Sequence, residues 1–337
     1  MKVLITGGLG YIGSHTVVEL SNKGIECIII DNLSNSDVKV LDRIRKITKT
    51  HITFQKCDLL DRNSLFEVFE RYRFDSVIHF AGMKSVGESV ENPLKYYEQN
   101  LFSTINLLKA MESESVKKLV FSSSATVYGD LSKSPISEEM PTSTMSPYGR
   151  TKLIIEEILH DLTISDPEWS IAILRYFNPV GAHSSGMIGE NPKGFPNNLM
   201  PYIAQVASGE KRHLNIFGDD YPTKDGTGVR DFIHVMDLAS GHERALKYIN
   251  SRTGCNVFNL GTGVGYSVRE LIQAFEEINK VSIPYRVVDR RPGDIAESFA
   301  DPSKAISELG WSAVRGIEEI VTDVWRWKQN MVKAGVN

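Results

Sequence analysis

The amino-terminal segment joins an apolar run to closely spaced glycines, and few folds accommodate that arrangement. Lys2–Thr6 has the sequence KVLIT, and Gly7, Gly10 and Gly13 follow it, at the start of a predicted helix over Tyr11–Asn22. Glycine permits a tight turn and lets the backbone approach a pyrophosphate, whose charge then faces free N–H groups at the helix N-terminus. Turn glycines alone give the same letters, but the order of strand, turn and helix favours a dinucleotide site.

An acidic residue ends the next predicted strand. Ile25–Ile30 is followed by Asp31, eighteen residues after Gly13. A carboxylate there can accept hydrogen bonds from both ribose hydroxyls and repels a 2′-phosphate, which predicts NAD rather than NADP. The alternative is a simple turn residue at a strand end. Asp58, after the third strand, is a weaker candidate for an adenine contact.

Strands and helices alternate through the first half of the chain. Further strands are predicted at His51–Cys57, Ser76–Phe80, Lys118–Ser122 and Ser170–Tyr176, and helices at Asn63–Arg71, Pro93–Glu112 and Tyr148–Thr163. This alternation predicts the α/β class with a doubly wound, Rossmann-like parallel sheet.

The character of the chain changes after Asn178, where Pro179–Pro196 is rich in loop-forming residues. We therefore expect an NAD-binding domain over residues 1–176 and a smaller, mainly substrate-binding lobe over residues 177–337. Part of about 230–260, such as Asn256–Leu260, is expected to return to the main sheet.

Composition limits the partners. The 337 residues carry a net charge of −4 with acidic and basic residues interleaved, which argues against nucleic acid or a membrane as partner. An anionic substrate would need a local cluster of Arg and Lys. The first strand begins at Lys2, which leaves no room for a signal peptide. The three cysteines, Cys27, Cys57 and Cys255, lack metal-type spacing and fit a reducing cytosol, so we expect a cytoplasmic protein without a metal.

Tyr148 and Lys152 lie four residues apart on a predicted helix and so share one face. Tyrosine has a pKa of about 10, and a nearby ammonium lowers it by stabilising the phenolate. Such a pair can accept and return a hydroxyl proton. The spacing is common on surface helices, so its meaning depends on Ser124, which follows a strand at the edge of the sheet where ligands bind.

At this point a family resemblance is clear. The segments TGGLGYIGSH, DNLSNS, HFAG-x-KSVGES, SSSATVYG, SPYGRTK, RYFNPVGAH and GVRDFIHV resemble the UDP-glucose 4-epimerase family, of the extended short-chain dehydrogenase/reductase type, from the first residues to about Asp301. The resemblance implies tightly bound NAD and an isomerase that inverts C4 of a UDP-hexose. Members of this family are often homodimers, so the resemblance also implies a homodimer, formed partly through the Pro93–Glu112 region.

The resemblance implies which residues contact NAD. They are Gly7, Gly10, Tyr11, Ile12, Gly13, Asp31, Asn32, Leu33, Ser34, Asn35, Ser36, Asp58, Leu59, Phe80, Ala81, Gly82, Lys84, Ser124, Tyr148, Lys152 and Phe177. Family members often carry Asn where this chain has Gln99. Because Asn100 is adjacent, that contact falls on either residue.

The implied UDP-sugar contacts lie mainly in the second lobe. They are Tyr176, Asn178, Asn198, Leu199, Asn215, Ile216, Phe217, Arg230, Arg291, Asp294 and Ser298. Arg230 and Arg291 supply the positive charge that a diphosphate requires.

The implied mechanism makes Tyr148, Ser124 and Lys152 the catalytic residues. The Tyr148 phenolate takes the O4 proton while the C4 hydride moves to NAD⁺, and Ser124 hydrogen-bonds O4. Lys152 keeps the tyrosine ionised and orients the nicotinamide ribose. The 4-keto sugar then turns over and receives the hydride on its other face.

Three questions stay open. A nucleotide-sugar dehydratase of the same fold would need an Asp-Glu pair after Thr126, where this chain has Val127 and Tyr128. A net oxidoreductase would use exchangeable cofactor. At position 298 some family members carry a bulky Tyr, so Ser298 predicts room for an N-acetyl group and activity on UDP-GlcNAc as well as UDP-glucose. The alternative is a plain UDP-glucose 4-epimerase.

Overall fold

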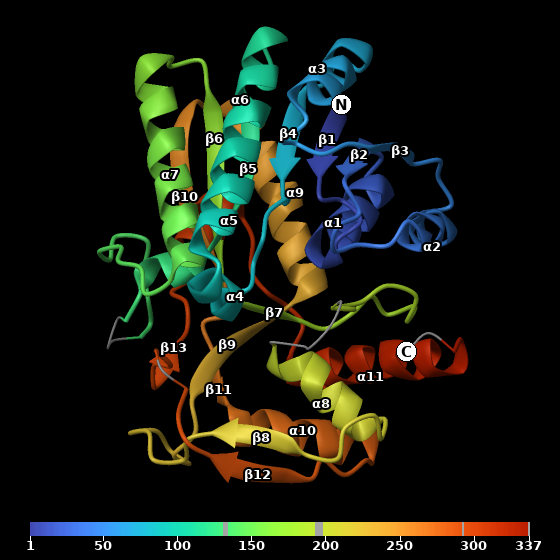
Figure 1. The fold of residues 1–337 in the computed structure, drawn as a ribbon, viewed down its shortest axis with the longest axis vertical. Coiled ribbons are helices and arrows are strands. Elements are labelled where there is room, and N and C mark those ends of the chain that lie inside the picture. Colours follow the sequence, from blue (N-terminus) through green and yellow to red (C-terminus); the bar gives the residue numbers. More distant parts are fainter. Residues whose placement is uncertain (131–133, 193–197, 292, 336–337) are drawn as a thin grey trace.

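The computed structural model describes residues 1–130, 134–192, 198–291 and 293–335. Figure 1 shows a sheet flanked by helices, with a smaller lobe beyond the carboxyl ends of the strands. The catalytic and cofactor candidates come mainly from the sheet and the substrate candidates mainly from the lobe. The site therefore lies where the two meet.

All strands of the main sheet run parallel. Their order is β10 (Gly254–Leu260), β6 (Ser170–Tyr176), β5 (Lys118–Ser124), β4 (Ser76–His79), β1 (Lys2–Thr6), β2 (Glu26–Asp31) and β3 (Thr53–Lys56). The chain winds outward in both directions from β1 and β4, which confirms the doubly wound prediction. The carboxyl ends of β1 and β4 form the switch point at which such sheets bind nucleotides.

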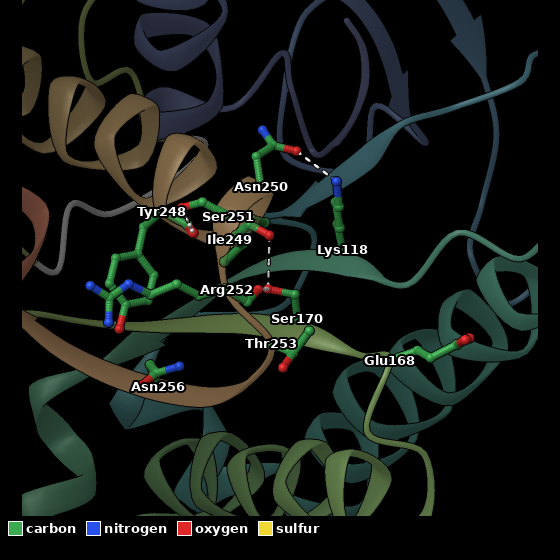
Figure 2. Close-up of a pocket in the computed structure, with 10 residues that line it drawn as sticks. All are labelled: Lys118, Glu168, Ser170, Tyr248, Ile249, Asn250, Ser251, Arg252, Thr253 and Asn256. Atoms are coloured by element: carbon green, nitrogen blue, oxygen red, sulfur yellow. Dashed lines mark hydrogen bonds between the residues drawn. The ribbon is translucent and has the colours of Figure 1, made fainter.

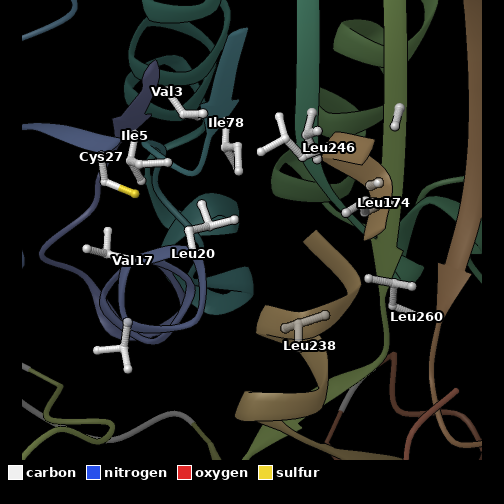
Figure 3. Close-up of a cluster of buried hydrophobic side chains, with 14 of the residues drawn as sticks. Val3, Ile5, Val17, Leu20, Cys27, Ile78, Leu174, Leu238, Leu246 and Leu260 are labelled. Carbon is white, nitrogen blue, oxygen red and sulfur yellow. The ribbon is translucent and has the colours of Figure 1, made fainter. Parts of the chain in front are cut away.

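Helices cover both faces of this sheet, because successive side chains of a strand point to opposite sides. Val3 and Ile5 face the core beneath α1 (Tyr11–Asn22) and α9 (Val235–Ser251), to which Val17 and Leu246 contribute (Figure 3). Leu4 lies in the opposite core, formed with α3 (Arg62–Arg71), α6 (Ser103–Ser113) and α7 (Pro147–Ser165). Two apolar layers therefore hold the sheet rigid beneath the site.

The predicted helix over Pro93–Glu112 is helical throughout but interrupted. It divides into α5 (Pro93–Tyr97), a π-helical turn (Glu98–Phe102) and α6. The Thr104 hydroxyl donates to the Asn100 carbonyl oxygen at 2.7 Å. The π-turn is accompanied by inward placement of the Asn100 side chain, which hydrogen-bonds to Met83. Single π-turns of this kind are frequent at functional sites.

The lobe has its own small sheets and core. β9 (Val229–His234) pairs with β7 (Asn178–Val180), β11 (Gly265–Ser267) and β13 (Glu297–Ser298), and β8 (Leu214–Phe217) pairs with β12 (Tyr285–Val288). Helices α8 (Leu199–Ala207), α10 (Val268–Asn279) and α11 (Ile317–Lys333) pack around a separate apolar cluster. Between β9 and β11 the chain re-enters the main fold as α9 and β10. Part of the predicted loop, residues 193–197, lies outside the described residues.

Among the helices of the described residues, none is long and apolar enough to cross a membrane.

Candidate active site

The glycine turn after β1 is sterically demanding. Gly7 has a φ of +66°, and a Cβ on it would lie 2.9 Å from the Ala81 nitrogen. A Cβ on Gly13 would lie 2.4 Å from the Gly7 oxygen. Helix α1 starts after Gly10 without a side-chain cap. The turn therefore presents an uncapped helix N-terminus over close-packed backbone, which fits the pyrophosphate of a dinucleotide.

Asp31 ends β2 beside this turn and is 8% exposed. Its carboxylate accepts hydrogen bonds from the Leu9 and Leu33 nitrogens, at 3.1 and 2.9 Å, and from the Ser36 hydroxyl at 2.7 Å. The carboxylate is thereby fixed at the end of β2, where the sequence predicts a contact with the ribose hydroxyls. One strand further, Asn32 donates to Asp58 at 3.0 Å, so these two predicted cofactor residues lie together.

The loop after β4, residues 80–84, is held by Asn100. Its side chain accepts a hydrogen bond from the Met83 nitrogen at 2.7 Å and donates to the Met83 oxygen at 3.1 Å. It also donates to the Thr151 hydroxyl at 3.0 Å, on α7. Asn100 is buried and Gln99 only partly so. Of the two candidate amides, Asn100 is therefore the one that positions this loop against the catalytic helix.

The three predicted catalytic residues converge at the carboxyl edge of the sheet. Tyr148 lies in the first turn of α7, whose start is capped by the Ser146 hydroxyl accepting from the Gly149 nitrogen at 3.1 Å. Ser124 is the last residue of β5, and its hydroxyl influences the pKa of the Tyr148 hydroxyl. Lys152, one turn along α7, is buried and donates to the Ser122 oxygen at 2.7 Å.

The charges at this trio differ from the expectation in one respect. Burial raises the pKa of the Tyr148 hydroxyl, and the hydrogen bond from Ser124 opposes that rise. The expected lowering of that pKa by Lys152 is absent, because the ammonium points to the Ser122 carbonyl and lies 4.8 Å from the centre of the Phe121 ring. Burial lowers the pKa of Lys152 to about 8, and the Glu156 carboxylate opposes this.

Glu156 is a site residue that the sequence reasoning missed. It follows Lys152 by one turn of α7 and forms a buried ion pair with Arg175 of β6, at 2.6 Å. It also accepts a hydrogen bond from Ser123. The signal was available in the sequence, because Tyr148, Lys152 and Glu156 recur every four residues on one helix face.

Glu190 was also missed, and it joins the two halves of the site. Its carboxylate lies 3.0 Å from the Lys84 ammonium and accepts a hydrogen bond from the Asn198 side chain at 2.8 Å. Lys84 is a predicted cofactor residue and Asn198 a predicted substrate residue. Glu190 therefore brings the two groups of predictions together through a contact that spans 106 residues of sequence.

The lobe gathers basic residues as the sequence analysis expected. Arg291 pairs with Asp294 at 3.1 Å and lies 4.4 Å from the centre of the Phe217 ring. Burial lowers the pKa of the Arg230 guanidinium, and Asp294 counteracts this lowering. Ser298 is paired in register with Arg230, on β13 and β9. Positive charge for a diphosphate and the predicted sugar-contacting serine thus lie on neighbouring strands.

Some predicted substrate residues have their side chains engaged elsewhere. The Tyr176 hydroxyl hydrogen-bonds to His242 in the core under α9. Ile216 points into the core of the lobe, which leaves only its backbone for a ligand. The Asn215 side chain accepts from Arg286 at 2.8 Å. Asn178 and Leu199 are partly buried, at the start of β7 and of α8.

A hollow of about 530 Å³ lies at the opposite edge of the sheet (Figure 2). It is lined by the first residues of β5 and β6, Lys118 and Ser170, and by the segment that follows α9, including Arg252. Ligands of doubly wound sheets bind at the carboxyl ends of the strands, and this hollow is at the amino ends. We therefore assign the site to the edge with Ser124 and Tyr148, despite the size of the hollow.

Comparisons with known proteins agree with this geometry. The family model described as GDP-mannose 4,6 dehydratase matches residues 4–324. A UDP-glucose 4-epimerase of Bacillus subtilis is 58% identical over 332 residues, covering 98% of each chain.

Solved structures give the same result. The UDP-glucose-4-epimerase of Stenotrophomonas maltophila, with bound NAD and formylated UDP-arabinopyranose, is 52% identical with a TM-score of 0.97 and covers 99% of each chain. The UDP-Glc/GlcNAc 4-epimerase of Campylobacter jejuni is 38% identical with a TM-score of 0.86, covering 98% of this chain and 99% of its own. These matches confirm the resemblance seen in the motifs. The chain belongs to the UDP-glucose 4-epimerase family.

Proposed function

We propose that this protein is an NAD-dependent UDP-hexose 4-epimerase that interconverts UDP-galactose and UDP-glucose. The observation that carries the proposal is the placement of Ser124 and Tyr148 together at the carboxyl edge of the sheet, next to the glycine turn. The relatives from Bacillus subtilis and Stenotrophomonas maltophila bear the name of this activity.

The residues divide the acid–base work. Tyr148 accepts the O4 proton as its phenolate and later returns it, and Ser124 donates a hydrogen bond to the same oxygen. Lys152, protonated below a pKa of about 8, adds positive charge that favours the phenolate once its ammonium turns from the Ser122 oxygen. Tyr148 and Lys152 are buried, so water is kept from the keto sugar formed between the two hydride transfers.

The cofactor side of the site fits NAD. Gly7, Gly10 and Gly13 would hold the pyrophosphate over the start of α1, and Asp31 would accept hydrogen bonds from the adenine ribose. NAD⁺, when bound, supplies the hydride acceptor and a positive charge. The two related structures of Stenotrophomonas maltophila and Campylobacter jejuni share this fold over nearly their whole length, and the former contains NAD.

Inversion requires that the sugar turn while the nucleotide stays in place. Arg230 and Arg291 would bind the diphosphate from the lobe, and Asn178 and Asn198 would contact the UDP-sugar. The keto sugar, attached only through its bond to the diphosphate, can then present its other face. The glycine turn and Asp31 would hold NAD so that the hydride is supplied to that face, and the hydroxyl at C4 would be inverted with no net change in cofactor.

We also propose that N-acetylated sugars are substrates. Ser298 is small and lies on the strand next to Arg230, where a tyrosine ring would take up more volume. The Campylobacter jejuni relative is named for both UDP-Glc and UDP-GlcNAc. A dehydratase is disfavoured because Val127 and Tyr128, which follow Thr126, are buried and provide no acid–base pair.

The direct test is turnover of UDP-galactose and UDP-GlcNAc by the purified protein without added NAD or NADH. We expect bound NAD to be released on denaturation, both substrates to equilibrate with their C4 epimers, and no net absorbance change at 340 nm. Stoichiometric consumption of added NAD⁺ would show a net oxidoreductase instead. Turnover of UDP-galactose without UDP-GlcNAc would leave a plain UDP-glucose 4-epimerase.

We also propose that the protein forms a homodimer, and an exposed apolar surface supports this. Val90 of α4 (Val86–Glu91), Leu94 of α5 and Phe102 expose apolar side chains on adjoining helices, with Leu94 81% exposed. Apolar side chains grouped in this way mark contact surfaces. We expect light scattering to give the mass of a dimer and Leu94→Asp to give a monomer. A wild-type monomer would end the proposal.

We place the enzyme in the cytoplasm, where nucleotide sugars are used.

A further inference from the structure

We propose that Asn259 is a positioning residue that fixes the wall of the sugar pocket carrying Ser298. The inference deepens the proposed function and rests on its assignment of Ser298 to the sugar. Asn259 is fully buried near the carboxyl end of β10, the edge strand of the main sheet. It does not touch the reacting atoms and acts through its neighbours.

Both the oxygen and the nitrogen of the Asn259 side-chain amide form hydrogen bonds. Its Oδ1 accepts a hydrogen bond from the Tyr128 hydroxyl at 2.7 Å, and its Nδ2 donates to the Ile136 oxygen at 2.8 Å. Its backbone nitrogen donates to Glu138 at 2.7 Å. A carbonyl oxygen such as that of Ile136 can only accept, so the orientation of the amide is determined. The side chain therefore bridges two segments that the sheet does not otherwise join.

The first segment leads to the chemistry. Tyr128 closes the single helical turn that follows Ser124. The Arg175 guanidinium lies 4.8 Å from the centre of the Tyr128 ring and is paired with Glu156, one turn beyond Lys152 on the catalytic helix. Tyr128 thus contacts, on one side, Arg175, whose partner Glu156 lies on the helix of Tyr148 and Lys152, and, on the other side, Asn259.

The second segment leads to the sugar. The Ile136 nitrogen donates to the Phe299 oxygen at 2.9 Å, and the Asp301 nitrogen donates to the Ile136 oxygen at 2.8 Å. Between these, the Ala300 nitrogen donates to Asp231 at 3.1 Å. These residues directly follow Ser298, so the backbone beyond it is held at three consecutive positions.

These hydrogen bonds beyond Ser298 are needed because β13 is very short. It pairs with β9 through its two residues, Glu297 and Ser298, and a ladder of two residues does not fix a strand by itself. Ala300 packs with Val127, Tyr128 and Ile136 in one buried apolar cluster. The position of the wall relative to Ser124 therefore depends on the amide that ties Ile136 to Tyr128.

The test removes one hydroxyl. Tyr128→Phe deletes the bond to Asn259 and leaves the ring facing Arg175. Tyr248→Phe is the matched control: Tyr248 is also buried, its hydroxyl donates to Glu308 at 2.9 Å, and Arg252 lies 5.0 Å from its ring centre. A second variant, Asn259→Asp, keeps the acceptor for Tyr128 and removes the donor to Ile136.

The readout is the dissociation constant of UDP-galactose beside that of UDP, by calorimetry on the purified enzyme, with thermal stability recorded. We expect Tyr128→Phe to weaken UDP-galactose binding roughly fivefold, the effect of one buried hydrogen bond, and to leave UDP binding unchanged. Asn259→Asp should do the same, and Tyr248→Phe should change neither constant.

Equal changes for both ligands, no change, or the same change in the control would overturn the proposal and leave Asn259 a structural residue only. Turnover measured in parallel distinguishes failure of the positioning role from failure of the proposed function. A shifted ratio of dissociation constants in an enzyme that does not epimerise would refute the proposed function and keep the positioning role.

Discussion

The sheet and the lobe hold their functional residues by different means. In the sheet, Ser124, Asp31 and the glycine turn are fixed by backbone ladders between two buried apolar layers. In the lobe, Arg291 depends on a side-chain contact with Asp294, and the strand that carries Ser298 pairs with β9 over two residues. The chemistry is thus built on the rigid part and substrate selection on the more adjustable part. Changes in one region should leave the role of the other intact.

The largest effect is expected at Tyr148, in the rigid region. Tyr148→Phe should lower kcat by about 10²–10⁴-fold, the usual contribution of a positioned acid–base group. The dissociation constant of UDP should stay the same, since the lobe supplies those contacts. Steady-state turnover and calorimetry measure the two quantities, with Tyr248→Phe as control. Near-normal turnover of Tyr148→Phe would remove this residue from the mechanism.

The next effect should appear at Ser298, in the lobe. Ser298→Tyr should abolish turnover of UDP-GlcNAc and spare UDP-galactose, because the ring fills the volume that an acetamide needs. Glu297→Tyr places the same ring on the other side of β13 and serves as control. Relative kcat/KM values for the two substrates give the result. Loss of both activities, or of neither, would contradict the assigned role.

A smaller effect is expected from the glycine turn. Gly13→Ala would place a Cβ 2.4 Å from the Gly7 oxygen and 2.8 Å from the Gly8 Cα, so the turn must open. The purified variant should retain less NAD per chain, measured after denaturation, with UDP affinity unchanged. Gly87→Ala is the control, since a Cβ there meets nothing within 4 Å. Full NAD content in Gly13→Ala would show that this turn does not hold the cofactor.

The smallest effect concerns Lys152 and pH. Its pKa falls from an ordinary 10.5 to about 8 in the folded chain, so the unfolded chain binds this proton more tightly. Between these values the unfolded state carries more protons, and folding stability gained from this group must rise with pH. Melting temperatures of wild type relative to Lys152→Met should therefore increase from pH 8 to pH 10. A constant difference would mean that burial does not perturb this lysine.

The sequence predicts the sheet far better than the lobe. Lys2–Thr6, Tyr11–Asn22 and Ser170–Tyr176 have the predicted bounds in the structure, because each is a clear apolar run or helical pattern. Helix α2 (Lys39–Thr48) was not predicted, since only Leu41 and Ile44 are buried within a highly charged segment.

Site residues, like the strands and helices, are predicted where the signal in the sequence is local. Tyr148 and Lys152 show themselves through local spacing, which a sequence displays directly. Asn259 and Glu190 do not, because each acquires its role from partners more than 100 residues away, Tyr128 and Lys84. These partners come together only in the folded chain, Tyr128 and Asn259 within the main fold and Lys84 and Glu190 across the site.

The most direct test of the whole account follows the hydrogen at C4. UDP-galactose with deuterium at C4 is incubated with the purified enzyme in ordinary water, and the UDP-glucose formed is examined by NMR and mass spectrometry. Transfer of a hydride within one site, by the rigid region on a sugar that the lobe lets turn, predicts that the deuterium is retained at C4 of the product. Replacement of the deuterium by solvent hydrogen would contradict this account and indicate inversion by proton exchange.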